Sequence, residues 1–176
     1  IRMLTDENGL HISQRNVTVS TCGIVPEMKK LAEENLQITL ALSLHAATDE
    51  KRRGLMPIAN TYSLAQLMEA CSFYFAQTGR RITFEYSLVR NINDTEKDAM
   101  QLSELIRGQN CHVNLIPVNP IKERSYVQSD KQAVEAFRDR LKKQGITATI
   151  RREMGRDIDG ACGQLRRRHT ASKKEN

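Results

Sequence analysis

The sequence alternates short runs rich in β-branched residues with longer stretches of helical periodicity, and this alternation restricts the fold more than any other feature. Rows of Val, Ile, Leu and Thr without polar alternation suit parallel strands that are buried on both faces. Strands are expected at residues 16–20, 37–45, 81–89, 112–118 and 147–151.

Helical periodicity fills the gaps between these runs, at residues 27–34, 64–78, 94–107 and 131–144. A serine followed three residues later by glutamine predicts a capping box at Ser63 and another at Ser129. The last three helices each end at a glycine just before a strand, at Gly79, Gly108 and Gly145. Repeated βα units of this kind predict an α/β fold with a mainly parallel sheet.

The composition is that of a globular protein, with 39% hydrophobic and 27% charged residues in a chain of 176. No apolar run approaches the roughly 20 residues that a membrane-spanning helix needs, and no secretory signal is recognisable, so a cytoplasmic location is expected. The chain opens at Ile1 within a helix-like stretch, which predicts that it is part of a longer protein.

The net charge of +6 is concentrated late in the chain and favours an anionic partner such as RNA. A solvated tail that only aids solubility is the alternative. The candidate RNA-binding residues are Arg151, Arg152, Arg166, Arg167 and Arg168.

Polar residues follow four of the predicted strands, where the carboxyl ends of parallel strands share one edge of the sheet. Ser20, Ser43, His45 and Asn119 lie at these ends and predict a polar ligand site. Each has a structural alternative: the serines as caps or turn formers, His45 as a core residue paired with backbone, Asn119 as a turn residue.

A Gly- and Asp-rich segment at residues 155–169 reads as an ordered loop around one cysteine, Cys162. Its small neighbours leave the sulfur accessible, and nearby arginines favour the thiolate. An inert thiol is the alternative. Cys22, Cys71 and Cys111 are expected to be small buried hydrophobes, and the absence of metal-ligand spacing in the sequence predicts no zinc site.

Four segments together resemble the RlmN family of radical S-adenosylmethionine (SAM) enzymes, dual-specificity RNA methyltransferases that act on carbon 2 of adenine. They are VTVSTCGIVP, LALSLHAATDEKR, NLIPVNPIKER and DIDGACGQLR, and the resemblance extends to about His169. It implies a partial (βα) radical SAM barrel over residues 1–152 that lacks its first strands. Residues 153–176 would form a methyl-carrier loop and a basic tail.

The resemblance also implies roles for individual residues. SAM would be contacted by Ser20, Ser43, Leu44, His45 and Asn119. Cys162 would accept a methyl group from one SAM, and reductive cleavage of a second SAM would activate that methyl group for transfer to adenine in 23S rRNA and tRNA.

The family's cluster motif C-x-x-x-C-x-x-C, its Gly-Gly-Glu motif and its second catalytic cysteine do not occur in this sequence. We therefore expect no metal ligands here, a [4Fe–4S] cluster only in a longer parent protein, and no activity of this chain alone. The first strand would be an open edge, which predicts self-association. Two alternatives remain: a related carbon-8 adenine methyltransferase, and a non-catalytic RNA-binding α/β module.

Overall fold

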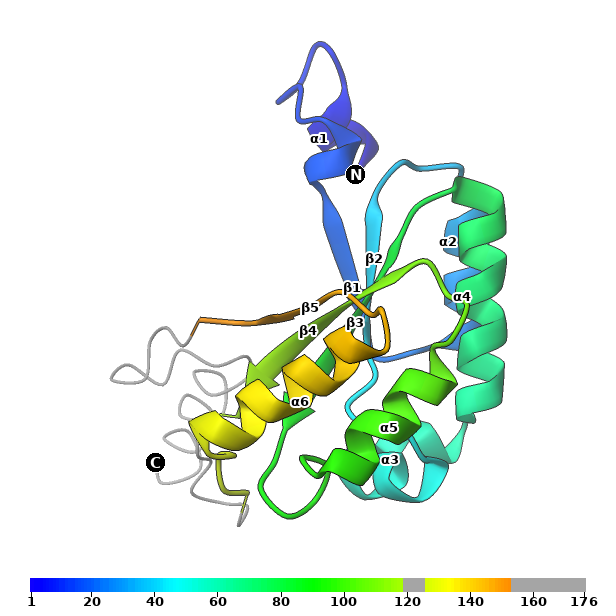
Figure 1. The fold of residues 1–176 in the computed structure, drawn as a ribbon. Coiled ribbons are helices and arrows are strands. Elements are labelled where there is room, and N and C mark those ends of the chain that lie inside the picture. The colour runs from blue at the N-terminus through cyan, green and yellow to red at the C-terminus, as the bar shows by residue number, and fades with distance from the viewer. Residues whose placement is uncertain (119–125, 153–176) are drawn as a thin grey trace, which may run out of the picture.

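The computed structural model describes residues 1–118 and 126–152, and within them five parallel strands form one sheet (Figure 1). The strands are β1 (Thr18–Thr21), β2 (Thr39–Ser43), β3 (Ile82–Leu88), β4 (Cys111–Pro117) and β5 (Ala148–Ile150). Their order in the sheet is their order in the chain. The expected α/β class and all five predicted strands are confirmed.

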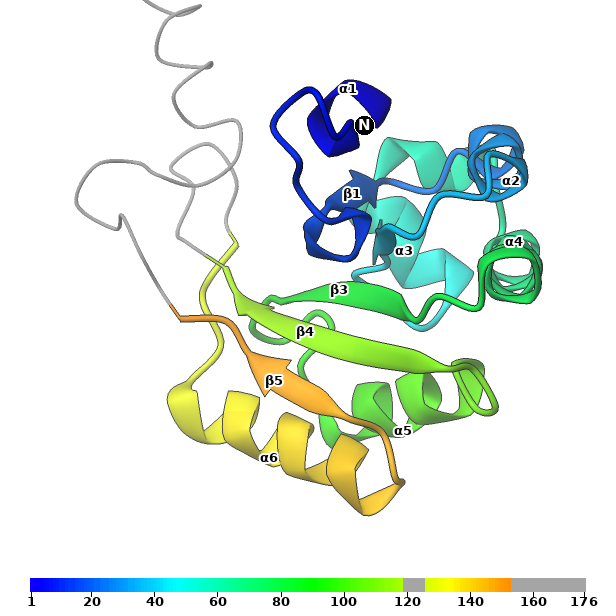
Figure 2. The ribbon, with the colours of Figure 1, turned by 90° about the horizontal axis from the view of Figure 1, so that it is seen from above.

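The main helices cover one side of this sheet, as Figure 2 shows. The described helices are α1 (Arg2–Thr5), α2 (Val25–Glu33), α3 (Asp49–Leu55), α4 (Leu64–Thr78), α5 (Glu96–Leu105) and α6 (Lys131–Lys143), with 3-10 turns at Gln14–Asn16 and Pro57–Asn60. Helix α2 packs against α4, and α5 packs against α6. The short α1 projects beyond the amino-terminal end of β1 (Figure 1).

Helix α4 begins and ends as its sequence predicts. The Ser63 hydroxyl accepts from the backbone N–H of Gln66, and the Gln66 side chain accepts from the N–H of Ser63. Gly79 ends the helix at φ +64°, a left-handed conformation that glycine adopts without a steric penalty.

The capping box predicted at Ser129 is wrong. Asp130 is the N-cap of α6 and makes no side-chain cap hydrogen bond, while the Ser129 hydroxyl donates to the carboxylate of Asp94 at 2.7 Å. A capping box is present instead at the N-terminus of α5, between Thr95 and Asp98. The carboxylate of Asp94, in the loop before α5, therefore takes the hydroxyl that the local sequence assigned to α6.

The helix-facing side of the sheet is the hydrophobic core. Burial alternates along β3, where Ile82, Phe84, Tyr86 and Leu88 are fully buried. The rings of Tyr86 and Phe137 lie 5.3 Å apart between centroids and join the sheet to α6.

The opposite side carries polar residues in registered rows. Ser43 pairs with Glu85, Glu85 with Asn114, and Asn114 with Thr149 across four neighbouring strands. Because alternate residues of a strand point to opposite faces, these side chains lie on the face that the main helices leave open. We call this the open face.

Candidate cofactor site

The carboxyl ends of β1 and β2 bring together those predicted cofactor-binding residues that the structure describes. Ser20 lies in β1 beside Ala41 of β2, and Ser43 is the last residue of β2. Ser20 is exposed and Ser43 is half-buried. Both occupy positions of the open face, so their hydroxyls are available to a ligand there.

Leu44 is fully buried, and its backbone is also engaged. Its N–H donates to the carbonyl of Glu85 at 2.9 Å, and its carbonyl accepts from Arg52 at 3.1 Å. Leu44 therefore anchors this segment to the core and fixes Ser43 and His45 on either side of it.

His45 has a left-handed backbone, with φ +60°, which is unusual for a residue other than glycine. Its Nδ1 accepts from the backbone N–H of Ser87 at 3.0 Å. Burial, and secondly the charge of Arg52, lowers the pKa of His45 to about 4. The imidazole is therefore neutral near pH 7 and carries its proton on Nε2, as a hydrogen-bond donor.

One ring nitrogen of His45 thus pairs with backbone, as expected of a core histidine, and the other has no hydrogen bond among the described residues. The buried side-chain amide of Asn93 holds the backbone of His45 and Ser87 in place. The side-chain NH₂ of Asn93 donates to the carbonyls of His45 and Ser87, each at 2.7 Å, and its oxygen accepts from Val89. Asn93 is itself fully buried.

Helix α3 and the buried Arg52 within it were not foreseen from the sequence. Thr48 caps the helix by accepting from the N–H of Lys51, and Lys51 forms an ion pair with Asp98 of α5. The sequence of α3, DEKRRGL, is mostly charged and shows no apolar periodicity. Nothing in such a pattern signals a helix with a buried face.

The turn after β1 holds Cys22 and Gly23. Cys22 is exposed, so the expectation of a buried hydrophobe is wrong for this residue, whereas Cys71 is buried and Cys111 is half-buried. Burial raises the pKa of Cys71 to about 12, which keeps it an unreactive thiol.

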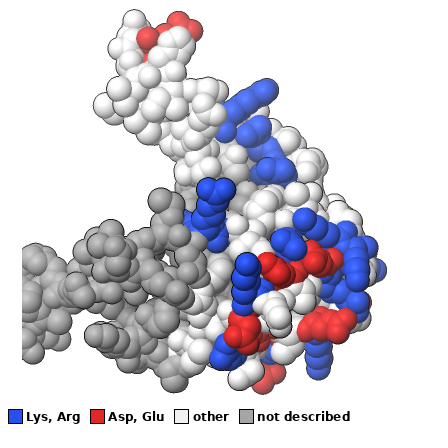
Figure 3. All heavy atoms as spheres, turned by 60° about the vertical axis from the view of Figure 1, so that its left-hand side comes forward, with Lys and Arg blue, Asp and Glu red and all other residues white. Residues whose placement is uncertain are grey.

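Arg151 and Arg152 follow β5 and are exposed, as an RNA-binding role requires. Arg151 also lines a cavity of about 590 Å³ at the carboxyl ends of β4 and β5, together with Arg90 and Lys131. By contrast, Arg138 and Arg140 of α6 form ion pairs with Asp139 and Glu96. In Figure 3, basic and acidic side chains accordingly lie interspersed on this side of the molecule.

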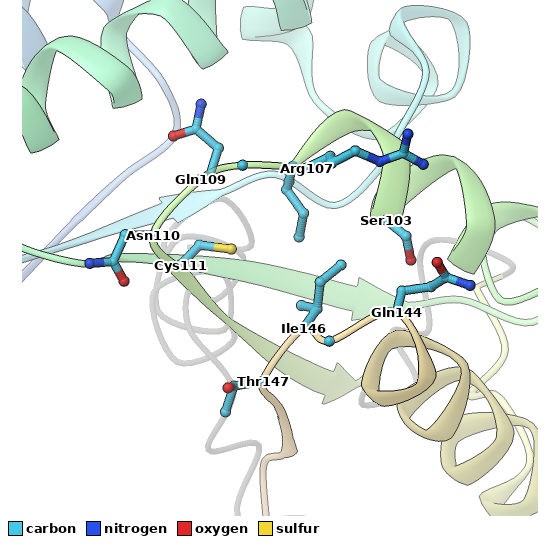
Figure 4. Close-up of a pocket in the computed structure, with 11 residues that line it drawn as sticks. Ser103, Arg107, Gln109, Asn110, Cys111, Gln144, Ile146 and Thr147 are labelled. Atoms are coloured by element: carbon cyan, nitrogen blue, oxygen red, sulfur yellow. The ribbon is translucent and has the colours of Figure 1, made fainter.

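A second cavity, of about 350 Å³, lies at the opposite end of the strands (Figure 4). Its lining includes Arg107, Gln109, Cys111, Gln144 and Thr147, from the ends of α5 and α6 and the segments leading into β4 and β5. Among the described residues, none of the predicted cofactor-binding side chains lines it.

Several predicted residues lie outside the described part of the chain. They are Asn119, Cys162, Arg166, Arg167 and Arg168. Within residues 1–118 and 126–152, no group of three or more His, Cys, Asp or Glu side chains is placed to hold a metal ion. In the same residues no helix is both long and apolar enough to cross a membrane.

The sequence matches curated proteins over almost its whole length. It is 63% identical over 96% of the chain to the probable dual-specificity RNA methyltransferase RlmN of Lachnospira eligens. It is 58% identical over 97% of the chain to the RlmN of Lachnoclostridium phytofermentans. The chain spans about half the length of these relatives, 48% in each case. No protein-family model matches it.

Solved structures agree with the sequence comparison. A radical SAM methyltransferase from Sphaerobacter thermophilus matches 93% of the chain with a TM-score of 0.89 and 43% identity, and the match covers 48% of that structure. A domain of a pyruvate-formate lyase-activating enzyme from Bacteroides vulgatus shares the fold alone, at 13% identity and a TM-score of 0.53. By sequence and by fold, the chain is similar over almost its whole length to about half of the curated RlmN RNA methyltransferases and to about half of a radical SAM methyltransferase.

Proposed function

We propose that this chain is the SAM-binding and methyl-accepting part of an enzyme that methylates carbon 2 of adenine in 23S rRNA and tRNA. One observation carries the proposal: Ser20, Ser43 and His45 lie at the carboxyl ends of two paired strands, on an open polar face, in a chain 63% identical to an RlmN protein. The cytoplasm is the proposed location.

The chemistry of the site suits a nucleoside cofactor. Two hydroxyls and a neutral imidazole N–H can pair with ribose and adenine groups, while Leu44 and Asn93 keep the backbone between them fixed. SAM supplies the methyl group and, with a [4Fe–4S] cluster, the radical chemistry. The cluster ligands are proposed to lie in the rest of the parent protein, because the motif C-x-x-x-C-x-x-C does not occur in this sequence.

The product identifies the function. The full-length protein, reconstituted anaerobically with iron and sulfide, is given SAM, a reductant and either a 23S rRNA fragment or tRNA. We expect 2-methyladenosine by mass spectrometry of the nucleosides. Recovery of 8-methyladenosine would assign the carbon-8 reaction, and unmodified RNA with an intact cluster would contradict a methyltransferase.

We further propose that Cys162 carries the methyl group, as a thiolate nucleophile within a loop and basic tail at residues 153–176. Changing Cys162→Ala should abolish RNA methylation and the methyl mass increment on the peptide that contains it. Cys111→Ala is the matched control, because Cys111 lies at the end of the strands opposite Ser20, Ser43 and His45. An unreduced methylation rate in Cys162→Ala would contradict the proposal.

The chain alone is proposed to be inactive. After incubation with iron and sulfide, the isolated chain should show no [4Fe–4S] absorption and no reductive cleavage of SAM, whereas the full-length protein should show both. A cluster spectrum with SAM cleavage from the chain alone would place sufficient ligands within it and contradict this proposal.

RNA is proposed to contact Arg151, Arg152 and the arginines at 166–168 through its phosphates. Changing Arg151 and Arg152 to Gln should weaken RNA binding and lower the slope of log affinity against log salt by about 1 to 2. Arg138→Gln is the control, because that guanidinium is paired with Asp139. An unchanged salt slope in the double variant would exclude these two contacts.

The free edge of β1 is proposed to pair with another strand. Within the described sheet β1 pairs only with β2, so its other side presents unpaired backbone groups. In the isolated chain we expect a second copy to take this position, which light scattering would detect as a concentration-dependent increase in mass. A monodisperse monomer at high concentration would contradict the proposal.

A further inference from the structure

Arg52 is among the largest fully buried side chains of the described residues, with 0% of its surface exposed. Arginine is almost never fully buried without a partner, because removing its charge from water is costly. No salt bridge to Arg52 occurs among the described residues, although the charges of Cys22 and Asp49 partly oppose the lowering of its pKa by burial. The hydrogen bonds of Nε and Nη2 go to backbone oxygens.

Three carbonyls accept its hydrogen bonds. Nε donates to Leu44 at 3.1 Å, and Nη2 donates to Cys22 at 2.7 Å and to Ser43 at 3.2 Å. The Cys22 carbonyl belongs to the turn after β1, and the other two belong to the end of β2. One rigid planar group therefore spans the two segments that carry the candidate cofactor residues.

The turn after β1 is also held against the guanidinium by close packing. A β-carbon at Gly23 would lie 2.6 Å from the Leu67 side chain and 3.4 Å from Nη2 of Arg52, and Gly23 has φ +99°. A side chain at this position would displace the Leu67 side chain and strain a left-handed backbone, while its contact with Nη2 would be an ordinary van der Waals one. Gly23 therefore lets the turn after β1 pack closely between Leu67 and Arg52.

We infer that Arg52 is a positioning residue for the cofactor: it fixes the distance and orientation of the Ser20 turn relative to the Ser43–His45 segment. The inference rests on the proposed function, since it assumes that SAM binds between these segments. Arg52 itself lies behind the backbone and does not touch the ligand. Its effect is transmitted through three carbonyls whose neighbouring residues face the cofactor.

A purely structural role of Arg52 leads to a different expected SAM affinity. If Arg52 only stabilised the fold, folded variants would bind SAM as the wild type does. Arg52→Lys separates these cases, because lysine retains the positive charge but has no planar fork to reach three carbonyls at fixed angles. Arg52→Met removes the charge and all three donors while keeping a long apolar stem.

The test measures SAM affinity by isothermal titration with the cluster-loaded, full-length protein, alongside circular dichroism and cluster absorbance. We expect Arg52→Lys and Arg52→Met to fold, to retain the cluster, and to bind SAM roughly 10- to 100-fold more weakly, the usual effect of removing a group that orients binding residues. Arg53→Met is the matched control, because Arg53 is the next residue of α3 and is exposed. It should bind SAM as the wild type does.

Wild-type affinity in folded Arg52 variants would overturn the inference and leave the proposed function intact. Failure of both variants to fold would assign Arg52 a role in stability alone and would also overturn the inference. Absence of SAM binding by the cluster-loaded wild type would instead overturn the proposed function, and the inference with it. The three results are distinguishable in one set of titrations.

Discussion

The two faces of the sheet differ in chemistry although they are made by the same strands. On β3, the face toward the helices holds Phe84 and Tyr86, both fully buried, and the open face holds Thr83, Glu85 and Ser87, all half-buried. Residues that are neighbours in the chain therefore have different roles. The helix-facing side chains contribute hydrophobic burial, and those on the open face present hydroxyl and carboxylate groups to the space that the helices leave uncovered.

His45 and Arg52 connect the two faces. His45 ends a segment of the open face, yet its pKa is set by burial and by a guanidinium within the fold. The backbone of the candidate site is therefore hydrogen-bonded to buried groups, while Ser20, Ser43 and His45 are not fully buried. This contrast between faces can be tested with substitutions on each side.

The largest effect is expected on the core face. Phe84→Ala should lower the free energy of unfolding by about 3 to 5 kcal/mol, since it removes a fully buried ring and leaves a cavity. Urea denaturation followed by circular dichroism measures this change. A loss below about 1 kcal/mol would mean that the core can collapse around the site.

His45 should make stability depend on pH. The unfolded state binds a proton near pH 6.5, whereas the folded state does so only near pH 4, so the free energy of unfolding should fall as the pH drops through this window. The loss from this group should reach about 3 kcal/mol at the acid end. Comparing urea unfolding of the wild type and His45→Gln from pH 7 to pH 4 isolates it, and parallel profiles would contradict a buried neutral imidazole.

A smaller effect is expected at a polar contact within the core face. The Tyr86 hydroxyl donates to the carbonyl of Asn93 at 3.0 Å, and Tyr86→Phe removes only that bond. The expected cost is about 1 kcal/mol, measured as a lower urea midpoint with an unchanged slope. A stabilised variant would show that the carbonyl finds another donor.

The smallest effect is expected on the open face. Thr83→Ala lies next to Phe84 but on the other side of the sheet, and it should change the free energy of unfolding by less than about 0.5 kcal/mol. The same denaturation assay applies. A loss comparable to that of Phe84→Ala would remove the distinction between the two faces.

Much of the fold could be predicted because local and long-range preferences agree. The strands lie within runs rich in β-branched residues, and Gly79, Gly108 and Gly145 adopt the left-handed conformations that their positions after helices indicate. The positions of Ser20, Ser43 and His45 followed from one rule, that parallel strands present their carboxyl ends together.

What could not be predicted depends on contacts between distant parts of the chain. Arg52 reads as one charge among many in α3, and only the carbonyls of two strand ends, 8 to 30 residues away, explain its burial. Ser129 has the local pattern of a capping box, yet Asp94, 35 residues away, takes its hydroxyl. Asn93 follows the same logic, because its acceptor on His45 lies 48 residues away.

The turn after β1 also limits how this sequence can diverge. Gly23 has φ +99°, a conformation that only glycine adopts easily, and a β-carbon there would lie 2.6 Å from the Leu67 side chain, whereas Cys22 beside it is exposed. Two adjacent codons should therefore differ widely in the substitutions they accept. In a library that varies both positions, functional clones should retain glycine at 23 and vary at 22. The invariant position would then lie in the turn that Arg52 joins to the end of β2.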